Sequence, residues 1–234
     1  MIKAVTFDFG DTLATGKLNV KDYRKRLLSY IHSLGWAVNE ASLEKAMDGM
    51  LVKLRKAREK NLEPRFEELY SSVLGELGIA ASEDVLNHIY ELYLQSFPCQ
   101  IIPGVEEVLT TLQRLYKLAV ISNATSNLPR HVLDKHGLSS FFHVVVVSRD
   151  IGFRKPDPRI FIYTLKELQV KSQQAIHVGN SMQTDVIGAK NVGMKTVWIK
   201  KEEQPILEKP DYTINSITEL PRILEMENSD NSSI

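Results

Sequence analysis

The 234-residue chain lacks several features that would point directly to a function. Its single cysteine, Cys99, can form no internal disulfide and cannot build a thiolate zinc site. No apolar run approaches the length of a membrane-spanning helix, and no basic segment followed by an apolar stretch begins the chain. Lysine plus arginine and aspartate plus glutamate both number 29, so the charge favours neither nucleic acid nor an anionic membrane as partner. We expect a cytoplasmic protein that binds neither.

The order of the apolar patterns predicts an α/β fold with an inserted helical bundle. Apolar runs typical of buried strands occur at residues 3–7, 118–121, 144–147, 175–178 and 196–199. The last four alternate with helical stretches, which implies parallel strand pairing and a three-layer α/β/α sheet domain. Between about Val20 and Phe97 the apolar spacing is helical instead, with a third helix expected to begin at Pro64.

These patterns also predict the domain boundaries. We expect residues 1–15 and 100–226 to form the sheet domain, because the first strand must join the later ones. Residues 16–99 form the inserted helical bundle, and the polar residues 227–234 are expected to be a disordered tail.

Polar side chains with distinct chemistry follow four of the predicted strands. Asp8 ends the first apolar run, and Ser122 and Asn123 follow the second. Lys155 lies in a segment whose backbone is restricted by two prolines, and Asp185 closes the loop after the fourth strand. Ligands of open α/β sheets bind at the carboxyl ends of the strands, so we expect these groups to meet there.

Such a set of groups is suited to phosphoryl transfer. A carboxylate can attack phosphorus while a lysine and a hydroxyl donor offset the charge of the phosphate oxygens, and carboxylates from two loops can hold Mg²⁺. Each group alone has a simpler interpretation, such as a helix cap for Ser122 or a solvated surface charge for Lys155. Because all of them follow predicted strands in order, the pattern favours a catalytic site.

Two specific segments resemble those of the haloacid dehalogenase superfamily of hydrolases. One is Gly152-x-x-Lys155-Pro156-x-Pro158, and the other runs from Val178-Gly179-Asn180-Ser181 to Asp185. The resemblance implies a Rossmann-like core in which the helical bundle, residues 16–99, is a cap domain. It also implies a phosphatase that uses Mg²⁺ and a small phosphorylated substrate, and that is a monomer or homodimer.

The resemblance implies a role for each candidate residue. Asp8 would be the nucleophile that forms an aspartyl-phosphate, and Lys155 would stabilise both Asp8 and the phosphate. Thr12 and Ser122 would bind phosphate, and we also expect Asn123 to bind substrate. Residues that would surround Mg²⁺ are Asp8, Gly10 through its carbonyl, Asn180 and Asp185.

Two positions depart from the family pattern. Family phosphatases usually carry, two residues after the nucleophile, an aspartate that acts as general acid and base; this chain has Gly10 there, and Asp11 is the candidate to replace it. Asn180 stands where a metal-binding aspartate is usual, so weaker Mg²⁺ binding is expected. General acid–base catalysis contributes about 10² to 10⁴-fold, so its loss predicts a preference for activated phosphates such as acyl phosphates.

Two other functions remain open at the level of sequence. One is carbon–halogen hydrolysis, the metal-free chemistry of the superfamily, although dehalogenases carry a bulky aromatic residue at the position of Gly10 and space their last motif differently. The other is a non-catalytic protein that binds a phosphorylated ligand or a protein partner. Retention of Asp8 argues against the second, because binding alone needs no nucleophile.

Overall fold

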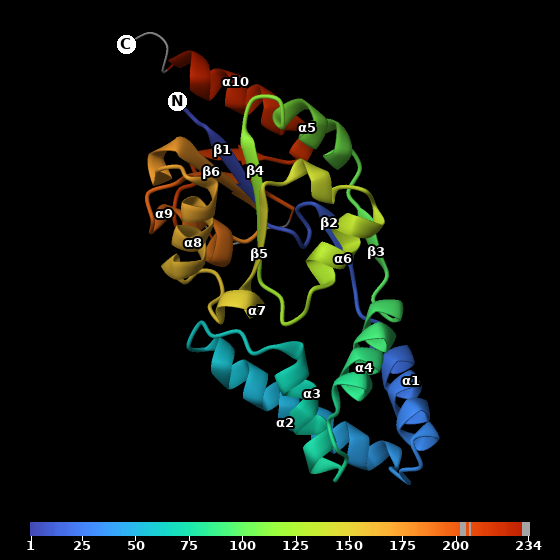
Figure 1. Ribbon diagram of the computed structural model, residues 1–234. Helices are drawn as coiled ribbons and strands as arrows, with labels where there is room; N and C mark the ends of the chain where they lie inside the picture. Colours follow the sequence, from blue (N-terminus) through green and yellow to red (C-terminus); the bar gives the residue numbers. More distant parts are fainter. Residues whose placement is uncertain (202–204, 206, 231–234) are drawn as a thin grey trace. The chain divides into compact units, whose positions relative to one another are not determined.

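The computed structural model describes residues 1–201, 205 and 207–230 (Figure 1). The chain divides into two compact units, Met1–Thr15 with Gln100–Ile234, and Gly16–Cys99. The segments that connect them pair as the short strands β2 (Ala14–Gly16) and β3 (Cys99–Ile101). Neither of these strands was predicted from the sequence.

The first unit contains a parallel sheet which, in the described residues, has the strand order β5-β4-β1-β6-β7-β8 (Figure 1). Its strands are β1 (Ala4–Phe7), β4 (Lys117–Ser122), β5 (Val144–Val147), β6 (Ala175–Gly179), β7 (Lys195–Ile199) and β8 (Tyr212–Ile214). Phe7 of β1 is level with Val120 of β4 and Val178 of β6. This register places the carboxyl ends of the three central strands side by side.

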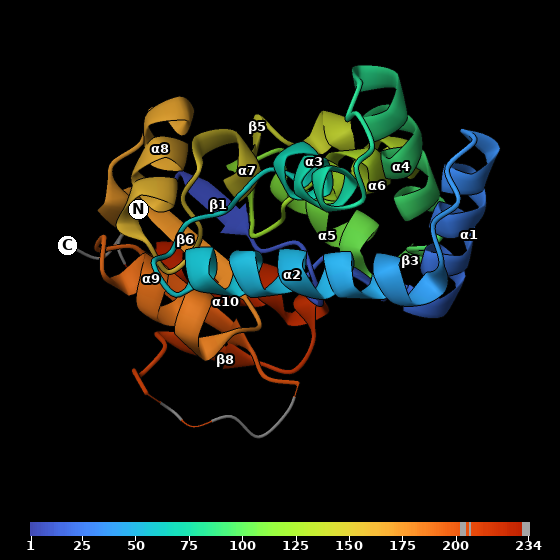
Figure 2. The same cartoon turned by 90° about the horizontal axis from the view of Figure 1, so that it is seen from below.

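Helices cover both faces of this sheet (Figure 2). They are α5 (Val105–Leu112), α6 (Leu128–Lys135), α7 (Ser148–Ile151), α8 (Pro158–Leu168), α9 (Ile187–Lys190) and α10 (Leu220–Asp230). Ile160 and Phe161 of α8 share a buried cluster with Ala4 of β1. The neighbouring residue Val5 points to the opposite face and is also fully buried. The predicted three-layer α/β fold is therefore confirmed, and β8 adds a strand that the sequence did not reveal.

The carboxyl-terminal segment differs from the prediction of a disordered tail over 227–234. Residues 227–230 belong to α10, and the Glu227 side chain is buried. Its carboxylate accepts a hydrogen bond of 2.5 Å from the Tyr212 hydroxyl and pairs with Lys195. These partners lie on β8 and β7, so the contacts that order Glu227 could not be found in the polar sequence of the tail. Residues 231–234 lie outside the described residues.

The second unit, described throughout, is helical. It contains α1 (Val20–Ser33), α2 (Glu40–Arg58), α3 (Phe66–Glu76) and α4 (Glu83–Gln95). The side chains of Asn19, Asn39 and Ser82 accept hydrogen bonds from the first turns of α1, α2 and α4. The predicted start of the third helix at Pro64 is wrong by two residues, because α3 begins at Phe66. Arg65 caps this helix, and its backbone N–H donates a hydrogen bond to the Glu68 side chain.

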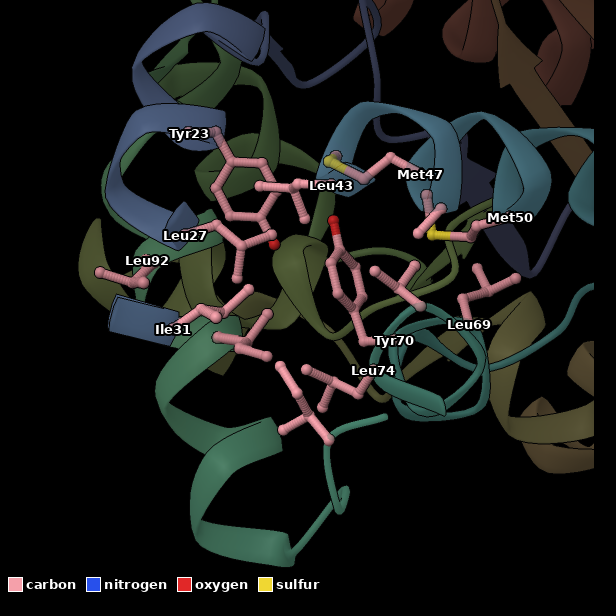
Figure 3. Packing of buried hydrophobic residues seen from close by; sticks show 14 of the residues in the cluster. Tyr23, Leu27, Ile31, Leu43, Met47, Met50, Leu69, Tyr70, Leu74 and Leu92 are labelled. Atoms are coloured by element: carbon pink, nitrogen blue, oxygen red, sulfur yellow. The ribbon is translucent and has the colours of Figure 1, made fainter. Parts of the chain in front are cut away.

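Apolar side chains from all four of these helices meet in the core of the second unit (Figure 3). Leu27 and Ile31 of α1 are buried there as their helical spacing predicts, together with two tyrosines, Tyr23 and Tyr70. The two phenol rings meet edge to face with centroids 6.1 Å apart. In the part of the chain that the structure describes, no helix is long and apolar enough to cross a membrane.

Candidate active site

Lys155 joins two carboxylates at the carboxyl edge of the sheet. Its Nζ lies 2.6 Å from Asp8 Oδ1 and 2.7 Å from Asp185 Oδ1. The side chains of Lys155 and Asp185 are each only 1% exposed, whereas that of Asp8 is 13% exposed. Three charged residues that the sequence predicts to meet are therefore together, with Asp8 the most accessible of them.

The position of Lys155 depends on Asn123, which follows β4. The Asn123 Nδ2 donates to the main-chain oxygen of Lys155 at 3.0 Å, and its Oδ1 accepts from the Lys155 N–H at 2.8 Å. Both ends of the amide are thus used by the backbone of Lys155. These bonds give Asn123 a role in positioning the lysine, and its substrate-binding role stays a prediction.

Asp185 is held by several donors besides Lys155. Its Oδ2 accepts a hydrogen bond of 2.9 Å from the N–H of Ser181, and His177 Nε2 lies 3.5 Å from its Oδ1. The other ring nitrogen of His177 is 2.8 Å from the hydroxyl of Thr6. Sequence analysis missed His177, because its contact with Thr6 follows from the register of β6 against β1, which the sequence does not give.

Burial and the shared lysine shift the pKa values of these groups. Burial raises the pKa of Asp8 to about 6, with Lys155 opposing and the charge of Asp185 adding to the shift. Burial also acts to raise the pKa of Asp185, but the charge of Lys155 and the hydrogen bond from His177 outweigh it, so that pKa lies below its usual range.

The two remaining titratable groups of the site differ in charge. Burial acts to lower the pKa of Lys155, but Asp185 and Asp8 together raise it, so the lysine is a cation at neutral pH. Burial is the largest cause that lowers the pKa of His177, so its imidazole is neutral there. Because an ionised carboxylate can only accept, the 3.5 Å contact with Asp185 is a hydrogen bond when Nε2 of the neutral ring carries the proton.

The remaining predicted residues near Asp8 differ in their surroundings. The Thr12 hydroxyl, which is buried, donates to Asp8 Oδ2 at 3.4 Å. Ser122 is the last residue of β4 and is 4% exposed. Gly10 is exposed, and a Cβ added there would meet nothing within 4 Å. Space therefore exists at Gly10 for the side chain that family phosphatases have.

The Asp11 side chain bonds to a residue of its own turn. Asp11 is exposed, and its backbone has a left-handed conformation with φ of 57°. Its carboxylate accepts a hydrogen bond of 2.9 Å from the Thr15 hydroxyl. It lines a small pocket together with Ile102 and Asn215. The geometry gives no support to the predicted role of Asp11 as general acid and base.

The oxygens beside Asp8 are suited to Mg²⁺. One end of the Asn180 amide lies 3.2 Å from the carbonyl oxygen of Gly10 and 3.3 Å from Asp8 Oδ2. Mg²⁺ takes oxygen ligands at about 2.0–2.1 Å in octahedral geometry, so neighbouring ligand oxygens lie about 3 Å apart. Asp8, Gly10 and Asn180 fit such a site if the amide presents its oxygen.

Asp185 stays a predicted metal ligand: its oxygens accept hydrogen bonds from Lys155 and Ser181, as those of Asp8 do from Lys155 and Thr12, but its side chain is only 1% exposed. Among residues 1–201, 205 and 207–230, no three histidine, cysteine, aspartate or glutamate side chains cluster as a metal site. Any cation here would therefore rely on uncharged oxygens for part of its coordination.

Comparison with known proteins relates this geometry to one family. The family model described as haloacid dehalogenase-like hydrolase matches residues 2–193. Glyceraldehyde 3-phosphate phosphatase from Pyrococcus furiosus is 31% identical over 238 aligned positions, which cover 99% of this chain and 95% of that protein.

Two solved structures have a similar fold. A 2-haloacid dehalogenase from Pseudomonas syringae pv. Tomato has a TM-score of 0.75 at 25% identity, covering 97% of this chain and 99% of that one. A phosphatase of the haloacid dehalogenase family from Thermococcus onnurineus has a TM-score of 0.63 at 26% identity, covering 95% and 98%. The similar proteins thus include both phosphatases and a dehalogenase.

Proposed function

This chain belongs to the haloacid dehalogenase-like hydrolases, and from that premise we propose that it is a Mg²⁺-dependent phosphatase of small phosphorylated metabolites. Asp8 would carry the phosphoryl group as an aspartyl-phosphate. The observation that carries the proposal is the contact of Lys155 with both Asp8 and Asp185, because it sets a buried cation beside a partly exposed carboxylate. Such a pair suits attack on an anionic phosphate.

The chemistry of the chain's own residues follows in two steps. A carboxylate oxygen of Asp8 attacks phosphorus, the bond from phosphorus to the ester oxygen breaks, and the leaving alcohol takes a proton from solvent. Water then attacks the same phosphorus, loses a proton, and releases inorganic phosphate while the Asp8 carboxylate is restored. With a pKa of about 6, Asp8 is ionised for the first step at neutral pH.

Lys155 and the hydroxyls of Thr12 and Ser122 would offset the charge on the phosphate oxygens. When bound through Asp8, Gly10 and Asn180, Mg²⁺ would supply positive charge beside the transferred group. With glycine at position 10, no side chain there can donate a proton to the leaving group. We therefore propose that acyl and aryl phosphates are better substrates than alkyl phosphates. The similarity to glyceraldehyde 3-phosphate phosphatase from Pyrococcus furiosus supports a small phosphorylated metabolite as the substrate.

Carbon–halogen hydrolysis is the second candidate, because a 2-haloacid dehalogenase gives the TM-score of 0.75. In that reaction Asp8 would attack carbon and displace halide, and water would then hydrolyse the ester. The oxygens gathered beside Asp8 favour the first candidate, since attack on carbon needs no cation.

The test is an assay of the purified protein beside an Asp8→Asn variant. Substrates would be p-nitrophenyl phosphate, acetyl phosphate, glyceraldehyde 3-phosphate and 2-chloropropionate, each with Mg²⁺ and with chelator. We expect phosphate release that requires both Mg²⁺ and Asp8. Halide release that is indifferent to chelator would instead select the dehalogenase function, and no turnover of any substrate would contradict both.

A further inference from the structure

The orientation of the Asn180 amide is fixed by its two neighbours. One end of the amide faces only donors, and its other end faces two acceptors, the carbonyl oxygen of Gly10 and Asp8 Oδ2. With Nδ2 toward them the amide donates hydrogen bonds of 3.2 and 3.3 Å, one of them to a carboxylate. With Oδ1 toward them, three acceptor oxygens would face one another with no proton between them, an arrangement that a bound cation stabilises.

The main chain on either side of this amide is held in place. The Trp198 indole donates to the main-chain oxygen of Asn180 at 3.1 Å, and the next residue, Ser181, donates its N–H to Asp185 Oδ2 at 2.9 Å. Trp198 is itself buried with Met182 and Val186. The smallest movement that changes which atom faces Asp8 is therefore rotation of the amide about its own terminal bond.

We propose that the Asn180 amide is a two-position element that takes the place of the cation when no cation is bound. Without metal, Nδ2 lies against Asp8 Oδ2 and Gly10 O as a neutral donor; with Mg²⁺, the amide turns so that Oδ1 joins the same oxygens as a ligand. The proposal rests on the metal site of the proposed function. Mg²⁺ would then have to displace the hydrogen bonds from Asn180 to Gly10 and Asp8 before it binds. This weakens Mg²⁺ binding in addition to the charge that is lost by having asparagine in place of aspartate.

The competition has consequences of opposite sign with and without metal. An aspartate at position 180 would set a second carboxylate against Asp8 with no donor between them, so the metal-free protein should be less stable. The same carboxylate offers Mg²⁺ a charged ligand without first breaking hydrogen bonds, so we expect Asn180→Asp to lower the Mg²⁺ dissociation constant by about 10- to 100-fold. Asn39→Asp is the matched control, because aspartate caps α2 as well as asparagine.

The direct test uses the unmodified chain and does not depend on turnover. The side-chain NH₂ signals of ¹⁵N-labelled asparagines would be recorded in chelator and during titration with Mg²⁺, and the Asn180 pair would be assigned by its loss in Asn180→Ser. We expect that pair to be protected from exchange in chelator and to shift and lose protection as Mg²⁺ binds.

Unfolding temperatures and calorimetric Mg²⁺ titrations of the wild type, Asn180→Asp and Asn39→Asp complete the experiment. We expect Asn180→Asp to unfold below the wild type in chelator and to recover with Mg²⁺, while Asn39→Asp follows the wild type. An Asn180 pair that stays protected while calorimetry shows Mg²⁺ bound would overturn the proposal. Failure of the proposed function appears separately, as phosphate release that persists in Asp8→Asn.

Discussion

Trp198 donates its indole N–H to the main-chain oxygen of Asn180 across 3.1 Å. The indole comes from β7 and the asparagine follows β6, so the bond ties the loop that carries Asn180 and Asp185 to the neighbouring strand. Trp198 is 1% exposed and packs with Met182 and Val186 of the same loop. Its contribution to the site is therefore indirect, through the position of the Asn180 backbone.

We expect Trp198→Phe to weaken both the fold and the site. The phenyl ring keeps part of the packing but loses the hydrogen bond and leaves a small cavity, which together destabilise the protein by about 1–3 kcal/mol. The Mg²⁺ dissociation constant should rise because the Asn180 backbone is less constrained. Urea unfolding and calorimetric titration measure the two effects, with Trp36→Phe, at a tryptophan that is 42% exposed, as control. An unchanged Mg²⁺ affinity in Trp198→Phe would contradict the positioning role.

Gly10 and Asp11 lead to a prediction about substrate preference. Position 10 has open space for a side chain, whereas Asp11 holds a left-handed conformation that glycine adopts without strain. We expect Gly10→Asp, alone or with Asp11→Gly, to raise kcat for alkyl phosphates by about 10² to 10⁴-fold by supplying a general acid. Acetyl phosphate should gain much less. Steady-state kinetics on both substrates decides this, and an unchanged ratio of the two rates would show that the aspartate does not reach the leaving group.

Much of this site could be predicted because its residues follow continuous apolar strands. Asp8 and Asp185 come after runs that could be recognised as β1 and β6, and parallel pairing of those strands brings them together. By contrast β8, with three residues between polar neighbours, is too short for apolar periodicity to reveal.

The contacts that refine the site depend on tertiary structure. The reciprocal hydrogen bonds of Asn123 with Lys155 join residues 32 positions apart, and no local pattern indicates them. His177 lies inside an apolar strand, where its role follows only from the register that sets it beside Thr6. Asp11, one residue after Gly10, was the candidate general acid and base, but its carboxylate accepts a hydrogen bond from Thr15 in the same turn.

Asp157, just after Lys155, gives the stability a dependence on pH. Its carboxylate accepts hydrogen bonds from the side chain and N–H of Arg159, and the side-chain bonds are the largest cause that lowers its pKa. Because the folded pKa is lowered, this stabilisation is present above the ordinary value of 3.8 and is lost as the pH falls through the folded value. Asparagine cannot ionise but still caps α8, so Asp157→Asn should be less stable than wild type at neutral pH and lose less stability on acidification. Urea unfolding at neutral pH and below pH 3.8 tests this, and parallel losses in both proteins would contradict it.

Lys155 neutralises two carboxylates at once, so its removal should affect stability as well as activity. Lys155→Met keeps the apolar part of the side chain but leaves the buried Asp185 and the partly exposed Asp8 without their cation, which destabilises the protein by about 3–5 kcal/mol. Phosphate release should fall below detection. Adding Asp185→Asn to Lys155→Met removes one of the unpaired charges, and we expect part of the lost stability, but none of the activity, to return. Lys166→Met, at an exposed lysine of α8, controls for the loss of a charge. Urea unfolding of the four proteins separates these effects, and a double variant no more stable than Lys155→Met would mean that the charge of Asp185 is not what the lysine offsets.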